Sequence, residues 1–139
     1  MTTSATGSIR DLTTRSGRTM LRGSPVLIVE EEFLIALDIQ QMLEALGVGQ
    51  TLFARNASEA RQLRQHWPDL ALAIIELRLD HSHNQQLPTE LSAAGVPLVI
   101  TTGDIGLSRN ITSAVPILVK PIPEETMASA IARALAINP

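Results

Sequence analysis

Short apolar segments alternate with longer amphipathic segments along the chain from Pro25 onward. This alternation is typical of a parallel β-sheet whose strands are joined by crossover helices. Five of the apolar segments have the length of a strand, and they cover residues 26–29, 51–54, 70–77, 98–101 and 117–119. The sequence therefore predicts an α/β fold of three layers, in which helices cover both faces of a five-stranded parallel sheet.

Helical periodicity follows each apolar segment, most clearly in residues 32–46. The apolar side chains of that segment recur at the spacing of one helical face, namely Ile35, Ile39, Met42, Leu43 and Leu46. Gly47 is suited to end this helix. Further helices are expected at residues 56–67, 88–94, 104–112 and 123–137, the segment 104–112 forming only a short one. Asn56 and Glu59 resemble a capping box, and Pro68 is expected to end the helix that they begin.

With 139 residues the chain has the length of one domain, and it contains no cysteine. The absence of cysteine excludes disulfides, thiolate zinc sites and cysteine nucleophiles. No apolar segment approaches the roughly 20 residues of a membrane span, and the N-terminus lacks the apolar segment of a secretory signal. We therefore expect a soluble, cytoplasmic protein with no membrane partner.

The net charge of −3 is distributed unevenly. Residues 1–24 hold four arginines and one aspartate, which leaves the remainder of the chain at −6. An acidic body argues against a nucleic-acid partner. We interpret residues 1–24 as a flexible, polar, arginine-bearing arm and residues 25–139 as the folded domain. The sequence leaves open whether Met20 and Leu21 pack on that domain.

Charged and hydroxyl side chains follow four of the predicted strands. Glu30 and Glu31 come after the first, Glu76 lies near the end of the third, Thr102 follows the fourth, and Lys120 follows the fifth. Lys120 is the only lysine of the chain. Ligand sites in open parallel sheets lie beyond the carboxyl ends of the strands. We therefore expect three carboxylates, a hydroxyl and an ammonium group to converge on one pocket.

Glu76 is the most informative of these residues, because an ionised side chain in a buried strand is costly unless another group pairs with it. One interpretation places Glu76 just beyond the buried part of the strand, where water solvates it. The other makes it part of a site. The convergence of charged residues at the same edge favours the site.

This constellation resembles the receiver domain of response regulators, and the resemblance covers about residues 25–137. It is carried by residues 26–32, 69–79, 97–103 and 119–121. The resemblance implies a CheY-like, flavodoxin-like fold with strand order 2-1-3-4-5. Residues 33–38 and the Thr-Thr-Gly ending of the fourth strand look most like single-domain receivers of bacterial stress signalling.

Residue roles follow from the resemblance. Glu30, Glu31, Glu76 and the backbone carbonyl of Arg78 occupy the positions of a receiver's Mg²⁺ site. Thr102 and Lys120 occupy the positions that contact the phosphoryl group. The Lys120–Pro121 bond is a candidate cis peptide. Ile117 occupies the switch position, where receivers carry an aromatic residue.

Glu76 stands where receivers carry the phospho-accepting aspartate. Its extra methylene moves the carboxylate outward by about 1.5 Å, and a misplacement of about 1 Å can cost on the order of a hundredfold in rate. The sequence therefore predicts that ordinary phosphorylation is lost. The extended carboxylate could instead reach Lys120 and Thr102, as a partial mimic of a phosphoryl group with its charge of roughly −2.

Two outcomes are open for the remaining carboxylates. Clustered carboxylates repel one another and raise one another's pKa. Weak binding of Mg²⁺ or Mn²⁺ would offset this repulsion. Alternatively, the side chain of Arg78 pairs with Glu30 or Glu31 and replaces the ion, if it does not simply extend from a loop into solvent.

The function that these residues favour is a stand-alone, receiver-like regulatory module of bacterial two-component (phosphorelay) signal transduction. It would bind a signalling protein, either a histidine kinase or a downstream regulator. The family's output face, made of the fourth helix, fifth strand and fifth helix, would serve docking or homodimerisation. One alternative is a receiver phosphorylated by a histidine kinase on Asp80 or Glu76. Another is a small metal-dependent hydrolase, but no nucleophile and base pair supports it, and we expect no enzyme.

Overall fold

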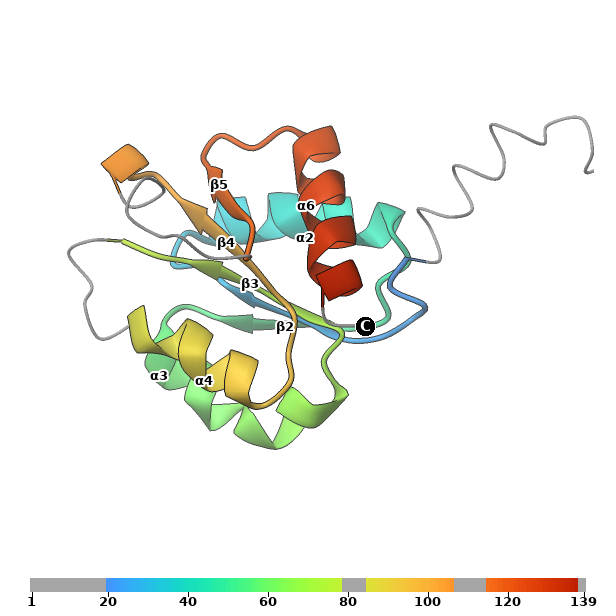
Figure 1. The fold of residues 1–139 in the computed structure, drawn as a ribbon, viewed down its shortest axis with the longest axis vertical. Coiled ribbons are helices and arrows are strands. Elements are labelled where there is room, and N and C mark those ends of the chain that lie inside the picture. The colour runs from blue at the N-terminus through green and yellow to red at the C-terminus, as the bar shows by residue number, and fades with distance from the viewer. Residues whose placement is uncertain (1–19, 79–84, 107–114, 138–139) are drawn as a thin grey trace, which may run out of the picture.

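The computed structural model of the chain describes residues 20–78, 85–106 and 115–137, and the structural account is confined to them. At its centre lies a five-stranded sheet in which all neighbouring strands are parallel, in the order β2-β1-β3-β4-β5 (Figure 1). The strands are β1 (Val26–Val29), β2 (Thr51–Ala54), β3 (Leu72–Glu76), β4 (Leu98–Thr102) and β5 (Ile117–Val119). The predicted fold class and strand order are confirmed.

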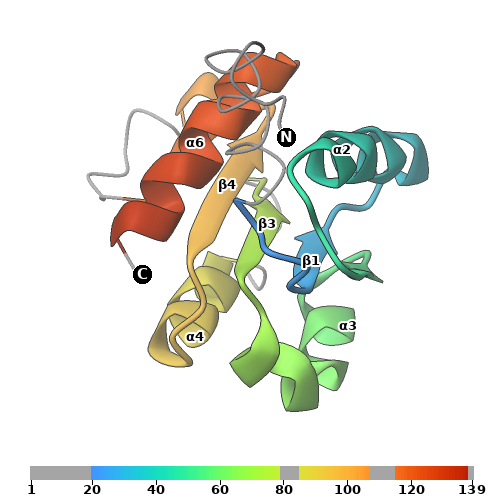
Figure 2. The same cartoon turned by 90° about the vertical axis from the view of Figure 1, so that its right-hand side faces the viewer.

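Helices cover both faces of this sheet, and they give the three predicted layers (Figures 1 and 2). One face carries α2 (Phe33–Ala45) and α6 (Glu124–Ile137). The other carries α3 (Ala57–Gln62), the 3₁₀ helix η1 (Arg64–Asp69) and α4 (Leu87–Ala93). Residues 107–112 of the fourth helix, which was predicted at 104–112, lie outside the described residues.

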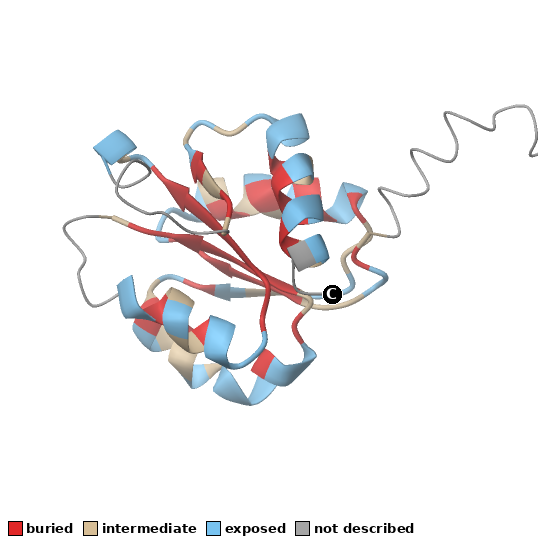
Figure 3. Cartoon of the chain, in the orientation of Figure 1, coloured by how far each residue is buried: buried red, intermediate tan, exposed pale blue. Residues whose placement is uncertain are grey.

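Successive residues of the strands point to opposite faces, so the sheet builds two separate cores (Figure 3). Val26, Ile28, Leu72, Ile74 and Val99 pack against α2 and α6. Leu27, Val29, Ala73, Ile75 and Ile100 pack on the side of α3 and α4. Burial on both faces explains why the three inner strands, β1, β3 and β4, appear in the sequence as continuous apolar segments.

The predicted helix at 56–67 was wrong in its second half. The α-helix ends at Gln62, and the tighter helix η1 follows it with Pro68 inside. Proline has no backbone N–H to continue an α-helix, whereas a short 3₁₀ segment accommodates it. This segment buries Trp67, whose indole N–H donates to the carbonyl of Ala60 at 3.1 Å. The predicted cap is present, since Asn56 Oδ1 accepts the N–H of Glu59 at 2.9 Å.

The chain ahead of β1 contributes to the core. Leu21 is only 1% exposed and lies in the core beneath α2 and α6. Its N–H donates to the carbonyl of Leu46 at 3.2 Å. Ordered packing thus begins ahead of the predicted boundary at residue 25, and residues 1–19 of the predicted arm lie outside the described residues. Within the described ranges, no helix has the length and apolarity needed to cross a bilayer.

Candidate functional site

Parallel strands bring the predicted site residues to the same edge of the sheet. Glu30 directly follows β1, Glu76 ends β3, and Lys120 directly follows β5. The two outer strands are tied to this edge by backbone hydrogen bonds, because the N–H of Glu30 donates to Ala54 and that of Lys120 to Thr102. The predicted convergence of charged residues therefore has a direct cause in the register of the strands.

Three of these residues form a compact group, which we call the buried ion cluster: Glu30, Glu76 and Lys120. The ammonium of Lys120 donates to Oε2 of Glu76 and, at 3.3 Å, to Oε1 of Glu30. Glu30 is 3% exposed and Glu76 8% exposed. Taking these carboxylates out of water is costly, and the shared ammonium offsets that cost. The second carboxylate oxygen of Glu30 accepts the backbone N–H of Glu32 at 3.0 Å.

The pKa values of the two carboxyls in the cluster are shifted in opposite directions. Burial, aided by the neighbouring carboxylate of Glu76, raises the pKa of Glu30 above its ordinary value. Burial acts in the same direction on Glu76, but hydrogen bonding and attraction from Lys120, with smaller contributions from Glu30 and Arg78, lower the net pKa of Glu76. Burial lowers the pKa of Lys120, yet its two carboxylate partners raise the net value. Glu76 and Lys120 thus form the charged pair, and Glu30 is the carboxyl that takes up a proton first on acidification.

A second ion pair lies at the rim of the cluster. Arg78 Nη1 donates to Glu31 Oε1 at 2.7 Å, and both side chains are partly exposed. The backbone carbonyl of Arg78, which was predicted as a metal ligand, accepts the side-chain amide of Gln85 at 3.2 Å. Of the two predicted arrangements for Arg78, the structure has the ion pair.

The carboxylates of the predicted Mg²⁺ site therefore face side-chain cations. In the described residues no three histidine, cysteine, aspartate or glutamate side chains are grouped so that they could hold a metal ion. An ion at this place would have to displace Lys120 or Arg78 from its carboxylate. The arrangement does not fit Mg²⁺ as it stands, and weak Mg²⁺ binding stays a prediction.

The two threonines at the end of β4 differ in their surroundings. Thr102 is fully buried, and its hydroxyl oxygen accepts the N–H of Asp104 at 2.9 Å. Thr101 is the register partner of Glu76, and its hydroxyl is buried without a hydrogen-bond partner in the described structure. Thr101 was not predicted as part of this group, because the strand register that places it beside Glu76 cannot be read from a single sequence.

The remaining predicted positions lie around this group. The Lys120–Pro121 bond is cis. Ile117, at the predicted switch position, is half-buried against the core on the side of α3 and α4. Asp80, the alternative phospho-acceptor, lies outside the described residues.

Comparison with known proteins finds similarity to response regulators and to receiver domains. No family model matches the chain. The phyllosphere-induced regulator PhyR of Methylorubrum extorquens is 32% identical over 98 residues, which are 68% of this chain and 37% of PhyR. A solved structure of the PhyR stress response regulator is 25% identical, with a TM-score of 0.70, and the match covers 94% of this chain and 51% of that one.

The receiver domain of the histidine kinase CKI1 from Arabidopsis thaliana, solved with Mg²⁺ and BeF₃⁻, shares the fold at 16% identity. Its TM-score is 0.66, and the match covers 88% of this chain and 97% of that domain. These likenesses confirm the resemblance to receiver domains that the sequence predicted. The chain spans about half or less of the length of the two PhyR relatives, so the likeness concerns only part of each.

Proposed function

We propose that this receiver-like regulatory module of two-component signalling acts by binding a protein partner and is not phosphorylated in the usual way. The buried ion cluster carries the proposal. By resemblance, Lys120 is the cation that would neutralise a phosphoryl group, and Glu76 is the side chain that would carry one. In this chain the two neutralise each other.

The chemistry of phosphoryl transfer supports this proposal. The acceptor oxygen must lie in line with the donor at close range. Glu76 is buried, carries one more methylene than aspartate, and directs one carboxylate oxygen at Lys120. A phosphoryl donor would have to separate this ion pair inside a poorly solvated site before it reached the carboxylate, and that separation is costly.

A divalent cation would have to compete with side-chain cations for these carboxylates. The side chains of Lys120 and Arg78 hold the carboxylates of Glu30, Glu76 and Glu31. Mg²⁺ favours carboxylate oxygens but gives up its own water reluctantly. We therefore expect Mg²⁺ to bind weakly, because it would have to displace at least one of these side-chain cations.

The proposed partner is a signalling protein of bacterial stress regulation, either a histidine kinase or a downstream regulator. PhyR, to which the chain is similar, is described as a stress response regulator. Two large apolar side chains, Ile105 and Val119, are exposed close to the output face predicted from the resemblance. We propose this face for docking or for homodimerisation, in a cytoplasmic setting.

Treatment with acetyl phosphate and Mg²⁺, followed by intact-mass measurement, tests the proposal. We expect the wild-type chain to remain unmodified, because Glu76 is extended and paired. The matched variant Glu76→Asp shortens the side chain to that of the usual acceptor, and we expect it to gain the mass of one phosphoryl group. The same treatment of Glu76→Ala reveals any acceptor elsewhere in the chain.

Stoichiometric modification of the wild-type chain would overturn the proposal. Loss of that modification in Glu76→Ala would then identify Glu76 as the acceptor, and its persistence would point to Asp80. Partner binding that survives in Glu76→Ala would show that the carboxylate does not itself set the binding-competent state.

A further inference from the structure

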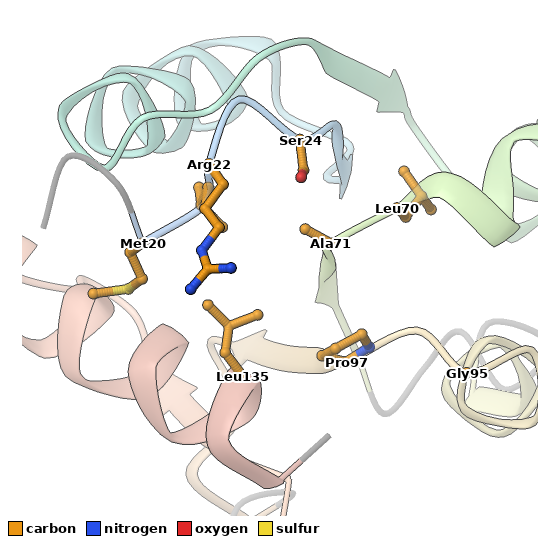
Figure 4. A pocket seen from close by; sticks show the side chains of 9 residues that line it. Met20, Arg22, Ser24, Leu70, Ala71, Gly95, Pro97 and Leu135 are labelled. Carbon is orange, nitrogen blue, oxygen red and sulfur yellow. The ribbon is translucent and has the colours of Figure 1, made fainter. Parts of the chain in front are cut away.

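A pocket lies at the edge of the sheet opposite the buried ion cluster. It has a volume of about 420 Å³ and lies where the chain enters β3 and β4, as Ala71 and Pro97 in its wall show. We call it the amino-edge pocket. The segment ahead of β1 and the last turns of α6 close it on the other sides, and Leu135 belongs to the latter (Figure 4).

Arg22 reaches into this pocket from an unusual backbone conformation. Its φ angle is +53°, and in the described parts of the chain no other residue besides glycines has a positive φ. A side chain disfavours this region, so a residue other than glycine persists in it only when the surrounding structure enforces it. Such conformations gather at binding sites more often than elsewhere.

Core packing and backbone hydrogen bonds hold the residues on both sides of Arg22 in place. On one side of it Leu21 is buried in the core, and on the other Gly23 N–H donates to the carbonyl of Gly47 at 2.8 Å. Ser24 N–H turns back to the carbonyl of Leu21 at 2.9 Å, and Gly49 N–H donates to Ser24 at 3.0 Å. Backbone hydrogen bonds therefore hold the turn of residues 21–24, which carries Arg22, against the loop between α2 and β2.

The guanidinium of Arg22 points into the pocket, and Ser24 lines another part of it with its hydroxyl (Figure 4). Within the described residues Arg22 takes part in no side-chain hydrogen bond or ion pair. Arg22 is exposed to solvent. The apolar side chains of Met20, Ala71 and Leu135 line the pocket with it, and no acidic side chain of the described residues does so. A cation beside apolar side chains is complementary to a molecule that joins an anionic group to an apolar body.

From this geometry we propose that the amino-edge pocket binds a small amphipathic carboxylate. Its carboxylate pairs with Arg22 and Ser24, and its short apolar chain lies against Met20, Ala71 and Leu135. The volume lies in the range of about 300–1,000 Å³ that is usual for small-molecule sites. In the described structure the exposed large apolar side chains lie elsewhere, at Phe33, Leu34, Phe53, Ile105 and Val119. A small ligand therefore suits this edge better than a broad protein interface.

Titration of the full chain with sodium hexanoate, followed by two-dimensional ¹H–¹⁵N NMR, tests the proposal. We expect hexanoate to shift the amide resonances of residues 20–24, 95, 96 and 135. Acetate, which lacks the apolar chain, and 1-hexanol, which lacks the charge, should shift them far less. Arg22→Gln should weaken hexanoate binding about tenfold or more, since a charge-assisted hydrogen bond is lost. Arg133→Gln, which removes an equal charge from the exposed side of α6, should bind as the wild type does.

Arg22→Gly separates binding from folding. Glycine accepts a positive φ, so this variant should unfold at a temperature no lower than the wild type while it loses hexanoate binding. The proposal is overturned if hexanoate leaves the pocket resonances unchanged, if 1-hexanol shifts them equally, or if Arg22→Gln binds hexanoate as tightly as Arg133→Gln does.

Discussion

At the scale of single residues, the buried ion cluster contains more carboxyl groups than cations. Two buried carboxylates, Glu30 and Glu76, share the ammonium of Lys120. Glutamate at position 76 has the same charge as aspartate but a longer side chain, and its carboxylate contacts the ammonium of Lys120. The substitution retains the charge of an acceptor site and, by our proposal, removes its chemistry.

Replacing Lys120 by methionine should expose this dependence. We expect the free energy of unfolding at neutral pH to fall by about 3–5 kcal/mol, because two buried carboxylates lose their compensating charge. Urea denaturation measures the change. The control is Arg78→Met, which breaks the more exposed pair with Glu31 and should cost only about 0–1 kcal/mol. Similar losses in the two variants would contradict the account.

The loss caused by Lys120→Met should also shrink in acid. Without the ammonium, the folded-state pKa values of both carboxyls rise above their unfolded values, so folding takes up protons and stability increases as the pH falls. In the wild type the lowered pKa of Glu76 has the opposite effect, because its stabilisation is lost as the pH falls through the folded pKa. The stabilities of the two proteins should therefore converge toward acid pH. A penalty independent of pH would be incompatible with this explanation.

At the scale of elements, the segment ahead of β1 lies in close backbone contact with the loop after α2. A Cβ added to Gly49 would lie 1.9 Å from the carbonyl oxygen of Gly23. Gly49→Ala should therefore lower the free energy of unfolding by about 1–3 kcal/mol through overpacking, as thermal unfolding would show.

Gly103→Ala provides the control for this substitution. An added Cβ there meets no heavy atom within 4 Å, and we expect little change in stability. If Gly49→Ala were tolerated as well as Gly103→Ala, residues 21–24 would not be fixed as described, and the base of the amino-edge pocket would lose its support.

The elements differ in how far the sequence predicts them, for physical reasons. The strands and α2 follow from continuous or periodic apolar segments, since burial imposes those patterns directly. The ending of α3 was not predicted, because the choice between an α-helix and a 3₁₀ helix around Pro68 depends on how Trp67 is buried. Leu21 belongs to a pair of apolar residues, Met20 and Leu21, in a polar segment, and no periodicity marks it as part of the core.

At the scale of the whole molecule, the two edges of the sheet have different characters. The carboxyl edge carries the ion cluster, whose members could be predicted because parallel strands end together. The pairing of Arg78 with Glu31 beside the cluster could not be predicted, because the choice of Arg78 between Glu30, Glu31 and solvent depends on side-chain geometry. The amino-edge pocket left no motif in the sequence, since it arises where β3, β4, α6 and the segment ahead of β1 meet.

Lys120 is held by Glu76 and Glu30, and we propose that it is therefore not open to a phosphoryl group. Titration of the glutamate side-chain carboxyl carbons by ¹³C NMR in the wild-type chain and in Lys120→Met tests it most directly. We expect Glu76 to titrate below the ordinary glutamate pKa and Glu30 above it, and the pKa of Glu76 to rise strongly when Lys120 is replaced. Ordinary pKa values for both carboxyls in the wild type, unchanged in the variant, would contradict it.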